Sequence, residues 1–130
     1  MEAKQYKVAI PKGYRIYFKA IDIAGAHHKK NEIIHVMRAK TVKFVLEPEP
    51  TNPYDSNAIK VIAIKKGWFF SSSFHIGYIP KNIAKQICDK SLLLELIPRP
   101  KRAWFGDRGG ISFSIDLLGT KANYSSFQSE

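Results

Sequence analysis

A proline-rich segment between two strand-like runs is the feature that most constrains how this chain folds. Three prolines fall within six residues at positions 48–53, and a proline fixes its own φ and disfavours helix at the residue before it. The segment is therefore an extended, turning connection. Asn52-Pro53 starts a turn, and the side chains at 55–57 can hydrogen-bond neighbouring backbone groups, which favours a rigid loop. A rigid loop that presents Tyr54 beside Asp55 is either a ligand site or only a well-made turn.

The length and composition are those of one globular domain. The chain has 130 residues, of which 45% are hydrophobic and 25% charged, enough for a single core. We expect this domain to span residues 1–119, and the Ser-rich segment 120–130 to be a polar, loosely ordered tail. The single Cys88 excludes an internal disulfide. No basic-then-apolar leader is evident, and no apolar run approaches the roughly 18 residues of a membrane span, so we expect a cytoplasmic protein without a membrane partner.

The charge of the chain is strongly positive and uneven. The formal net charge is +10 and the pI about 9.8. Residues 1–45 carry ten Lys or Arg against three acids, residues 46–80 are balanced, and residues 81–130 carry eight against five. An excess of this kind indicates a partner rich in phosphates, such as a nucleic acid.

The spacing of apolar residues predicts a mainly all-β fold. Val42, Phe44 and Leu46 alternate with polar neighbours, as in a half-buried strand. The same reading predicts strands at 5–10, 14–24, 32–38, 41–47, 57–64, 74–79, 92–97 and 111–118, and one helix from Pro80 to about Lys90. Residues 98–102 form a stiff basic connection, and Cys88 is expected in the core. We therefore expect a small OB-like β-barrel with one α-helix packed on it or plugging its open side.

Enzymatic readings of the polar residues are weak. Asp55, Asp107 and Asp116 together with His27 and His28 are the residue types of a metal-dependent nuclease, but no Asp-x-Glu or Glu-x-Lys cluster lies on one strand. Adjacent histidines in a strand point to opposite faces, which disfavours a shared metal ion. We therefore expect no catalytic residues, no metal and no cofactor.

An aromatic run at Trp68–Phe70 follows a turn at Lys65–Gly67. An insertion folded onto the core is the commoner arrangement for such residues. The alternative is an exposed contact surface or an aromatic platform, and in that case the chain is a protein–protein adaptor.

Two neighbouring motifs resemble the HIRAN domain. The first reads Glu-Pro-x-x-x-Asn-Pro-Tyr-Asp-x-Asn-Ala-Ile-x-Val over residues 47–61. The second reads His-Ile-Gly-Tyr-Ile-Pro-Lys over residues 75–81 and leads into an Ile-Ala-x-x-Ile helix. The resemblance covers roughly residues 16–118. HIRAN domains occur at the amino end of Swi/Snf-type fork-remodelling helicases, including the helicase-like transcription factor, and as stand-alone bacterial and phage proteins.

The resemblance implies a non-catalytic OB-like module that binds the 3′-hydroxyl end of single-stranded DNA, in DNA repair or stalled-fork processing. By this resemblance, Tyr54 packs on the terminal nucleotide and Asp55 accepts a hydrogen bond from the 3′ hydroxyl. Lys81 matches a phosphate-binding lysine at the start of a helix. The scaffold of the loop is then Asn52, Pro53 and Asn57. A partner such as a helicase or a nuclease would supply any further activity.

The histidine pair departs from the family pattern, and Phe113 has two possible roles. The helicase-type domains show Gly-x-Arg-Tyr where this chain has His27 and His28, and an imidazole does not replace the bidentate guanidinium. Lys29 and Lys30 are candidates to compensate for the lost charge. Phe113 matches a base-contacting aromatic, but its alternation with neighbouring isoleucines favours the core.

Overall fold

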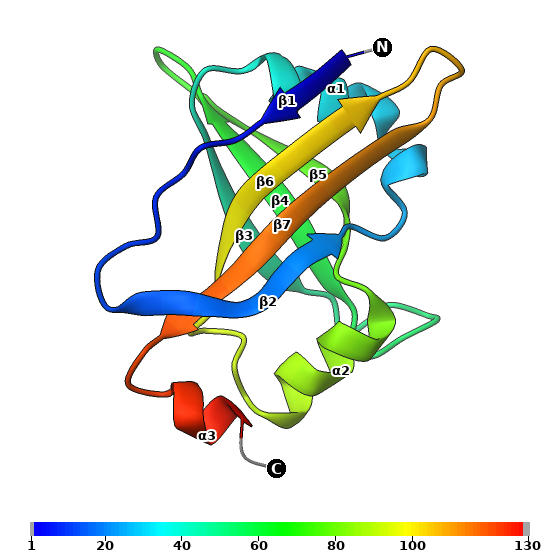
Figure 1. The fold of residues 1–130 in the computed structure, drawn as a ribbon. Helices are drawn as coiled ribbons and strands as arrows, with labels where there is room; N and C mark the ends of the chain where they lie inside the picture. The colour runs from blue at the N-terminus through cyan, green and yellow to red at the C-terminus, as the bar shows by residue number, and fades with distance from the viewer. Residues whose placement is uncertain (1, 129–130) are drawn as a thin grey trace.

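Two antiparallel sheets face each other in this protein (Figure 1). The computed structural model describes residues 2–128. The four-stranded sheet has the order β1 (Glu2–Gln5), β6 (Ile97–Phe105), β7 (Ile111–Thr120) and β2 (Tyr14–Asp22). The three-stranded sheet has the order β3 (Val42–Pro48), β4 (Ile59–Lys66) and β5 (Ser71–Tyr78). Beyond these ladders, an isolated bridge between Ala24 and Tyr78 joins the end of β2 to the end of β5. The mainly β fold with few helices is therefore confirmed.

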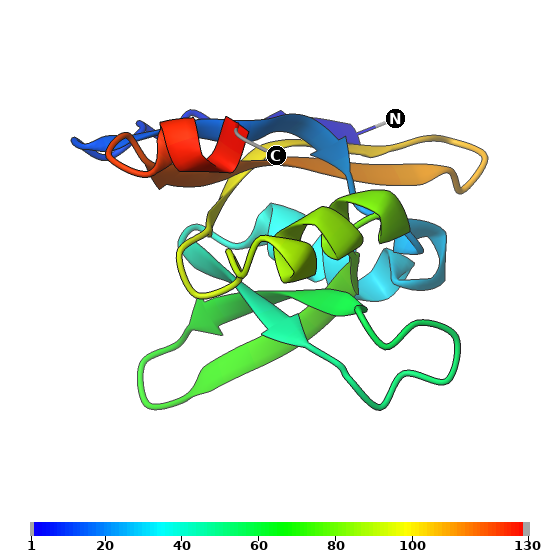
Figure 2. The same cartoon turned by 90° about the horizontal axis from the view of Figure 1, so that it is seen from below.

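Two helices lie at opposite ends of the space between the sheets, α1 (Lys30–Arg38) near the top and α2 (Lys81–Asp89) at the bottom of Figure 1, and both fall between the two layers when viewed from below in Figure 2. A short 3-10 turn, η1 (Ala26–His28), precedes α1, and α3 (Tyr124–Gln128) follows β7. The helix expected from Pro80 to about Lys90 is α2, which begins at Lys81 with Pro80 as its N-cap and buries Ala84 and Ile87. Within residues 2–128 every helix is too short or too polar to span a membrane.

The core is formed by apolar side chains from both sheets and from α1 and α2. Its members with no exposed surface include Ile33, Val36, Ile59, Val61, Ile76, Ile87, Phe113, Ile115 and Leu117. Burying each such side chain contributes about 1.5–3 kcal/mol of free energy, and this is the main contribution that holds the two sheets together.

The strand expected at 32–38 is wrong, because this segment is part of helix α1. Ile33, Val36 and Met37 are buried, and they follow the i, i+3, i+4 spacing of one helical face. The β-branched residues suggested a strand, but only the helix places all three against the core. The expected single helix therefore becomes three α-helices among the described residues.

The strand expected at 92–97 is also wrong, and so is the connection expected at 98–102. Strand β6 runs from Ile97 to Phe105 and includes Pro98 and Pro100. Both prolines pair with β7 on one side, whereas β1 pairs only with residues 102–105 on the other. The prolines therefore lie where β6 is an edge strand, the position at which a missing N–H costs no ladder hydrogen bond.

The segment expected to be a loosely ordered tail continues the fold up to residue 128. Strand β7 reaches Thr120, and α3 packs two aromatic rings against the core. The rings of Tyr17 and Phe127 are stacked with centroids 4.5 Å apart, and Tyr124 contacts Tyr17 edge to face at 5.5 Å. Residues 129–130 of the expected tail lie outside the described residues.

Candidate nucleic-acid interface

The connection between β3 and β4 is held together by one amide side chain. We call residues 49–57 the Asn52 loop. Asn52 Oδ1 accepts hydrogen bonds from the backbone N–H groups of Tyr54 at 2.9 Å and Asp55 at 3.1 Å. Asn52 Nδ2 donates to Glu49 Oε1 at 2.7 Å, and its backbone N–H donates to Glu49 O at 3.0 Å. The Asn-Pro start of the loop is thereby locked in a single turn.

The loop exposes an aromatic ring next to a carboxylate. Tyr54 is 91% exposed and Asp55 is half-buried. Asp55 Oδ1 accepts from the backbone N–H of Asn57 at 2.9 Å, whereas no donor among the described residues reaches Oδ2. Asn57 contributes its backbone rather than its side chain to this turn. The Asn52 loop therefore presents one carboxylate oxygen and one ring face to solvent.

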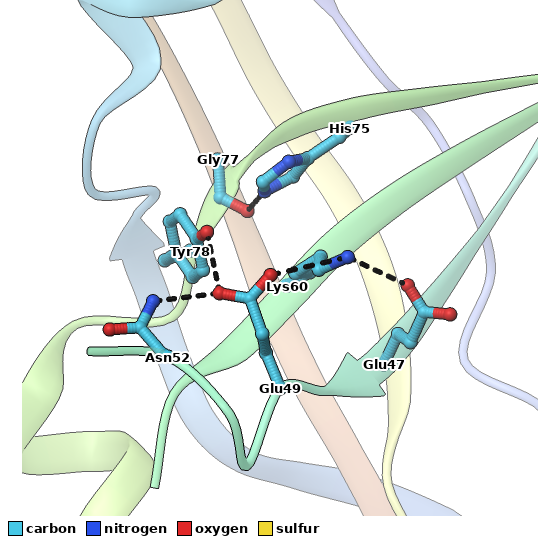
Figure 3. Close-up of polar contacts among 7 residues, drawn as sticks. All are labelled: Glu47, Glu49, Asn52, Lys60, His75, Gly77 and Tyr78. Carbon is cyan, nitrogen blue, oxygen red and sulfur yellow. Dashed lines mark hydrogen bonds and ion pairs between the residues drawn. The ribbon is translucent and has the colours of Figure 1, made fainter. Parts of the chain in front are cut away.

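A carboxylate that sequence reasoning missed connects the loop to the sheet (Figure 3). Glu49 Oε1 accepts from Asn52 Nδ2 and, at 2.9 Å, from the hydroxyl of Tyr78 on β5. Glu49 Oε2 lies 3.3 Å from Lys60 Nζ, which is also 3.5 Å from Glu47 Oε2. The only sequence signal for this role is the placement of Glu49 three residues before Asn52, across a turn.

This network keeps Glu49 ionised. The hydrogen bonds from Asn52 and then Tyr78 lower the pKa of Glu49, and they outweigh the effect of partial burial. The hydrogen bond to Glu49 in turn raises the pKa of Lys60. Two carboxylates and one ammonium leave a local excess of one negative charge beside the Asn52 loop.

A close backbone contact brings a second segment to the same side of the molecule. Tyr78 and Ala24 exchange two hydrogen bonds, Ala24 N to Tyr78 O at 2.8 Å and Tyr78 N to Ala24 O at 2.9 Å. Gly77 has a φ of +147°, and a Cβ there would lie 2.3 Å from Ile23 Cγ2 and 2.6 Å from Ala24 O. Only glycine fits this approach. Because η1 starts two residues after Ala24, it lies on the same side as the Asn52 loop (Figures 1 and 2).

The η1 turn and the two residues after it carry the histidines and lysines expected to contact phosphates. His27 and His28 are both exposed, with ring centroids 3.9 Å apart. Lys30 Nζ lies 4.7 Å from the centre of the Phe105 ring. The positive charge of Lys29 influences the protonation of His75. Burial, followed by the charge of Lys29, lowers the pKa of His75. Within residues 2–128 no group of three or more possible metal ligands comes together.

Lys81 and Phe113 have very different surroundings. Lys81 is exposed at the first residue of α2. Phe113 has no exposed surface, and its ring packs at 5.7 Å from Tyr6 and 5.5 Å from Phe44. A base cannot reach Phe113 in this fold, so the core position favoured by its alternation is the one that it occupies.

Three further expectations change with the structure. Cys88 is exposed rather than in the core, and its Sγ lies 3.8 Å from Asn57 O. Trp68–Phe70 does not fold onto the core, because its three side chains are 97%, 87% and 83% exposed. Asp116 is fully buried and ion-paired with Arg99 at 2.7 Å. Asp116 therefore does not meet Asp55 in a nuclease centre.

Comparison with protein families identifies the central part of the chain. The model of the HIRAN domain matches residues 21–89, more than half of the chain, from the end of β2 to the end of α2. Comparisons with curated proteins and with solved structures gave no significant match. The matched region contains the Asn52 loop, η1 and Lys81. HIRAN domains are generally non-catalytic DNA-binding modules, which supports nucleic-acid binding by this protein. The chain belongs to the HIRAN domain family.

Proposed function

We propose that this protein is a non-catalytic module that binds single-stranded DNA and holds its 3′-hydroxyl end at the Asn52 loop. The observation that carries the proposal is the pairing, on a rigid turn, of an exposed Tyr54 ring with the open Oδ2 of Asp55. Such a module serves DNA repair or the processing of stalled forks, together with a helicase or nuclease that supplies the chemistry.

Tyr54 is suited to stack on the terminal base. Its backbone N–H is held by Asn52, so the point from which the ring extends is fixed before DNA arrives. Stacking on an aromatic side chain contributes about 1–3 kcal/mol per base and tolerates any base identity. Tyr54 therefore supplies affinity for a strand end without sequence preference.

Asp55 is suited to read the chemistry of that end. A carboxylate accepts a hydrogen bond from a free hydroxyl and repels a phosphate group in the same place. The negative excess of Glu47 and Glu49 beside Lys60 strengthens this repulsion. The loop therefore favours a strand that ends in a hydroxyl over one that ends in a phosphate.

The rest of the strand leaves the loop toward the cationic side of the interface. Lys81 at the start of α2 and Lys29 and Lys30 after η1 supply ammonium groups for the phosphates, and His27 and His28 supply imidazole hydrogen bonds. Each neutralised phosphate of a single strand contributes about 0.7 to the salt dependence of binding. The end is read at the Asn52 loop and the phosphates are held beside it.

The proposal is tested with fluorescent oligonucleotides at a stated salt concentration. Strands with a 3′ hydroxyl, strands with a 3′ phosphate and circular strands are titrated with the wild-type protein and with Asp55→Ala. We expect about tenfold tighter binding of the 3′ hydroxyl, equal to 1.4 kcal/mol, and loss of this preference in Asp55→Ala. Asp89→Ala, which removes an equal charge from the exposed end of α2, should keep the preference.

Three results contradict the proposal. Equal affinity for all three strands leaves only a basic surface that binds DNA without regard to its end. Cleavage of the strands in the presence of magnesium establishes a nuclease instead. Failure to bind any of the strands favours a protein–protein adaptor.

A further inference from the structure

An ordered aromatic turn projects from the end of the three-stranded sheet that lies away from the Asn52 loop (Figure 1). We call Trp68, Phe69 and Phe70 the aromatic tip; their exposed fractions are 97%, 87% and 83%. Gly67 N donates to Phe70 O at 2.8 Å, and a Cβ on Gly67 would meet the same oxygen at 2.8 Å. The turn therefore closes tightly because glycine is present, and it holds three aromatic rings in water. Contiguous exposed apolar surface of this size marks a binding site.

The neighbourhood of the aromatic tip is positively charged. Lys65 and Lys66 end β4 directly before the turn, and Lys65 pairs with Val42 at the start of β3. Arg38 lines a hollow of about 140 Å³ together with Lys65. We call Arg38, Lys40, Lys43, Lys65 and Lys66 the basic cluster.

The charge of the basic cluster is largely uncompensated. Arg38 contacts Glu2 at 3.5 Å, with both side chains exposed. No ion pair within residues 2–128 involves Lys40, Lys43, Lys65 or Lys66. Lys40, Lys43 and Lys66 are exposed and Lys65 is half-buried. Unpaired ammonium groups beside aromatic rings are complementary to a chain of phosphates that carries flat bases.

We propose that the aromatic tip and the basic cluster form a second binding site for single-stranded DNA, in which unpaired bases stack on Trp68 and Phe69 and phosphates bind Lys65 and Lys66. This second site lies outside the region that reads the 3′ end. The choice of single-stranded DNA as its ligand rests on the proposed function. The three aromatic residues offer ring faces that a paired duplex cannot use, because its bases already stack on each other.

The distance between the two sites sets the length of strand that reaches both. The Asn52 loop precedes Ile59 and the aromatic tip follows Lys66, so β4 separates them. Seven steps of about 3.3 Å give about 23 Å. At about 3.4 Å per nucleotide in a stacked strand, this distance corresponds to about seven nucleotides. Glu47 and Glu49 lie at the end of β4 next to the Asn52 loop, where both contact Lys60, so two separate contacts are expected rather than one continuous groove.

Exposed tryptophan and lysine side chains also bind anionic lipid surfaces. Membership in a DNA-binding family favours the nucleic acid.

The test compares strand length with the integrity of the aromatic tip. The full chain and its Trp68→Ala/Phe69→Ala variant are titrated with strands of about 5 and about 20 nucleotides, the longer one with either a 3′ hydroxyl or a 3′ phosphate. We expect the variant to bind both long strands about tenfold more weakly than the wild type, and the short strand equally well. Leu94→Ala, which removes a side chain that is 99% exposed in the connection between α2 and β6, should leave all affinities unchanged.

A spectroscopic readout identifies the contact itself. The chain has two tryptophans, so Trp104→Phe leaves Trp68 as the reporter, and stacking on bases should quench its emission. Unchanged affinity of the double variant for the long strands overturns the proposal. Blue-shifted Trp68 emission with phosphatidylserine vesicles, together with unchanged DNA affinity, replaces it with a lipid surface. If the wild type binds long strands with a 3′ hydroxyl and with a 3′ phosphate equally well, only the proposed end recognition is contradicted. The loss of affinity in the double variant is measured with both kinds of strand and so tests the aromatic tip separately.

Discussion

Replacing Asn52 with alanine removes the side chain on which the order of the Asn52 loop depends. Three hydrogen bonds disappear, those from Tyr54 N and Asp55 N to Oδ1 and that from Nδ2 to Glu49 Oε1. Each bond contributes about 0.5–1.5 kcal/mol net, and water can replace the partners because the bonds are exposed or half-buried. We therefore expect a loss of about 1.5–2 kcal/mol in the free energy of unfolding, at the low end of the sum. For a chain of this size, the melting temperature should fall by about 5–10 °C.

The same change should weaken recognition of the 3′ end, because a loosened loop must be ordered again when DNA binds. We expect about tenfold lower affinity for a strand with a 3′ hydroxyl. Circular dichroism on heating and in urea measures the first effect, and fluorescence anisotropy measures the second. NMR titration of Glu49 gives a third readout: its pKa should rise, because Asn52 is the main cause of its lowering.

Ser56→Ala is the matched control, since Ser56 is exposed in the same loop and its side chain forms no hydrogen bond among the described residues. This variant should behave as the wild type. A wild-type melting temperature and a wild-type 3′ preference in Asn52→Ala would refute the idea that this side chain preorganises the site.

Three further changes test the fold around the interface. Gly77→Ala should cost about 3 kcal/mol in urea denaturation, because its Cβ would strike Ala24 O and its φ is +147°. Asp116→Asn should cost about 3 kcal/mol at neutral pH by leaving Arg99 without its buried partner. Burial raises the pKa of Asp116, but hydrogen bonds from Ala20 N and Arg99 outweigh it and lower the pKa. The stabilisation is therefore complete above the unfolded pKa of about 3.9 and lost as pH falls through the lower folded value, so the cost of Asp116→Asn should shrink in acid. Alkylation of Cys88, whose thiol pKa is raised first by partial burial and then by Asp89, should be slow at neutral pH, accelerate at higher pH and slow further when a 3′-hydroxyl strand is bound.

The parts of the fold that local chemistry determines were predictable. The Asn52 loop follows from its prolines and Asx side chains, and helix α2 follows from Pro80 and the spacing of Ile83 and Ile87. Strand β3 follows from alternation, and β4 and β5 overlap the strands expected at 57–64 and 74–79, although β5 begins earlier, at Ser71. In each case the signal lies within a few consecutive residues, so a single sequence is sufficient.

The parts that depend on distant partners were not predictable. Strand β6 contains Pro98 and Pro100, which are tolerated only because β1 stops short of them. The Glu49 network depends on Tyr78, which is 29 residues away in the chain. Helix α1 was misread because its β-branched residues favour strands, although Ile33, Val36 and Met37 already showed helical spacing. Tertiary context overrides propensity at such positions.

The proposed 3′-end site is complete only while the bridge between Ala24 and Tyr78 joins the two sheets. The η1 turn follows one sheet and the Asn52 loop belongs to the other, and the two hydrogen bonds of this bridge span the boundary between them. A DNA strand that contacts both η1 and the Asn52 loop stabilises, by its binding free energy, the conformation in which this bridge is formed. Amide hydrogen exchange at Ala24 and Tyr78 therefore serves as an internal gauge of occupancy, and it should slow in proportion to the concentration of 3′ ends.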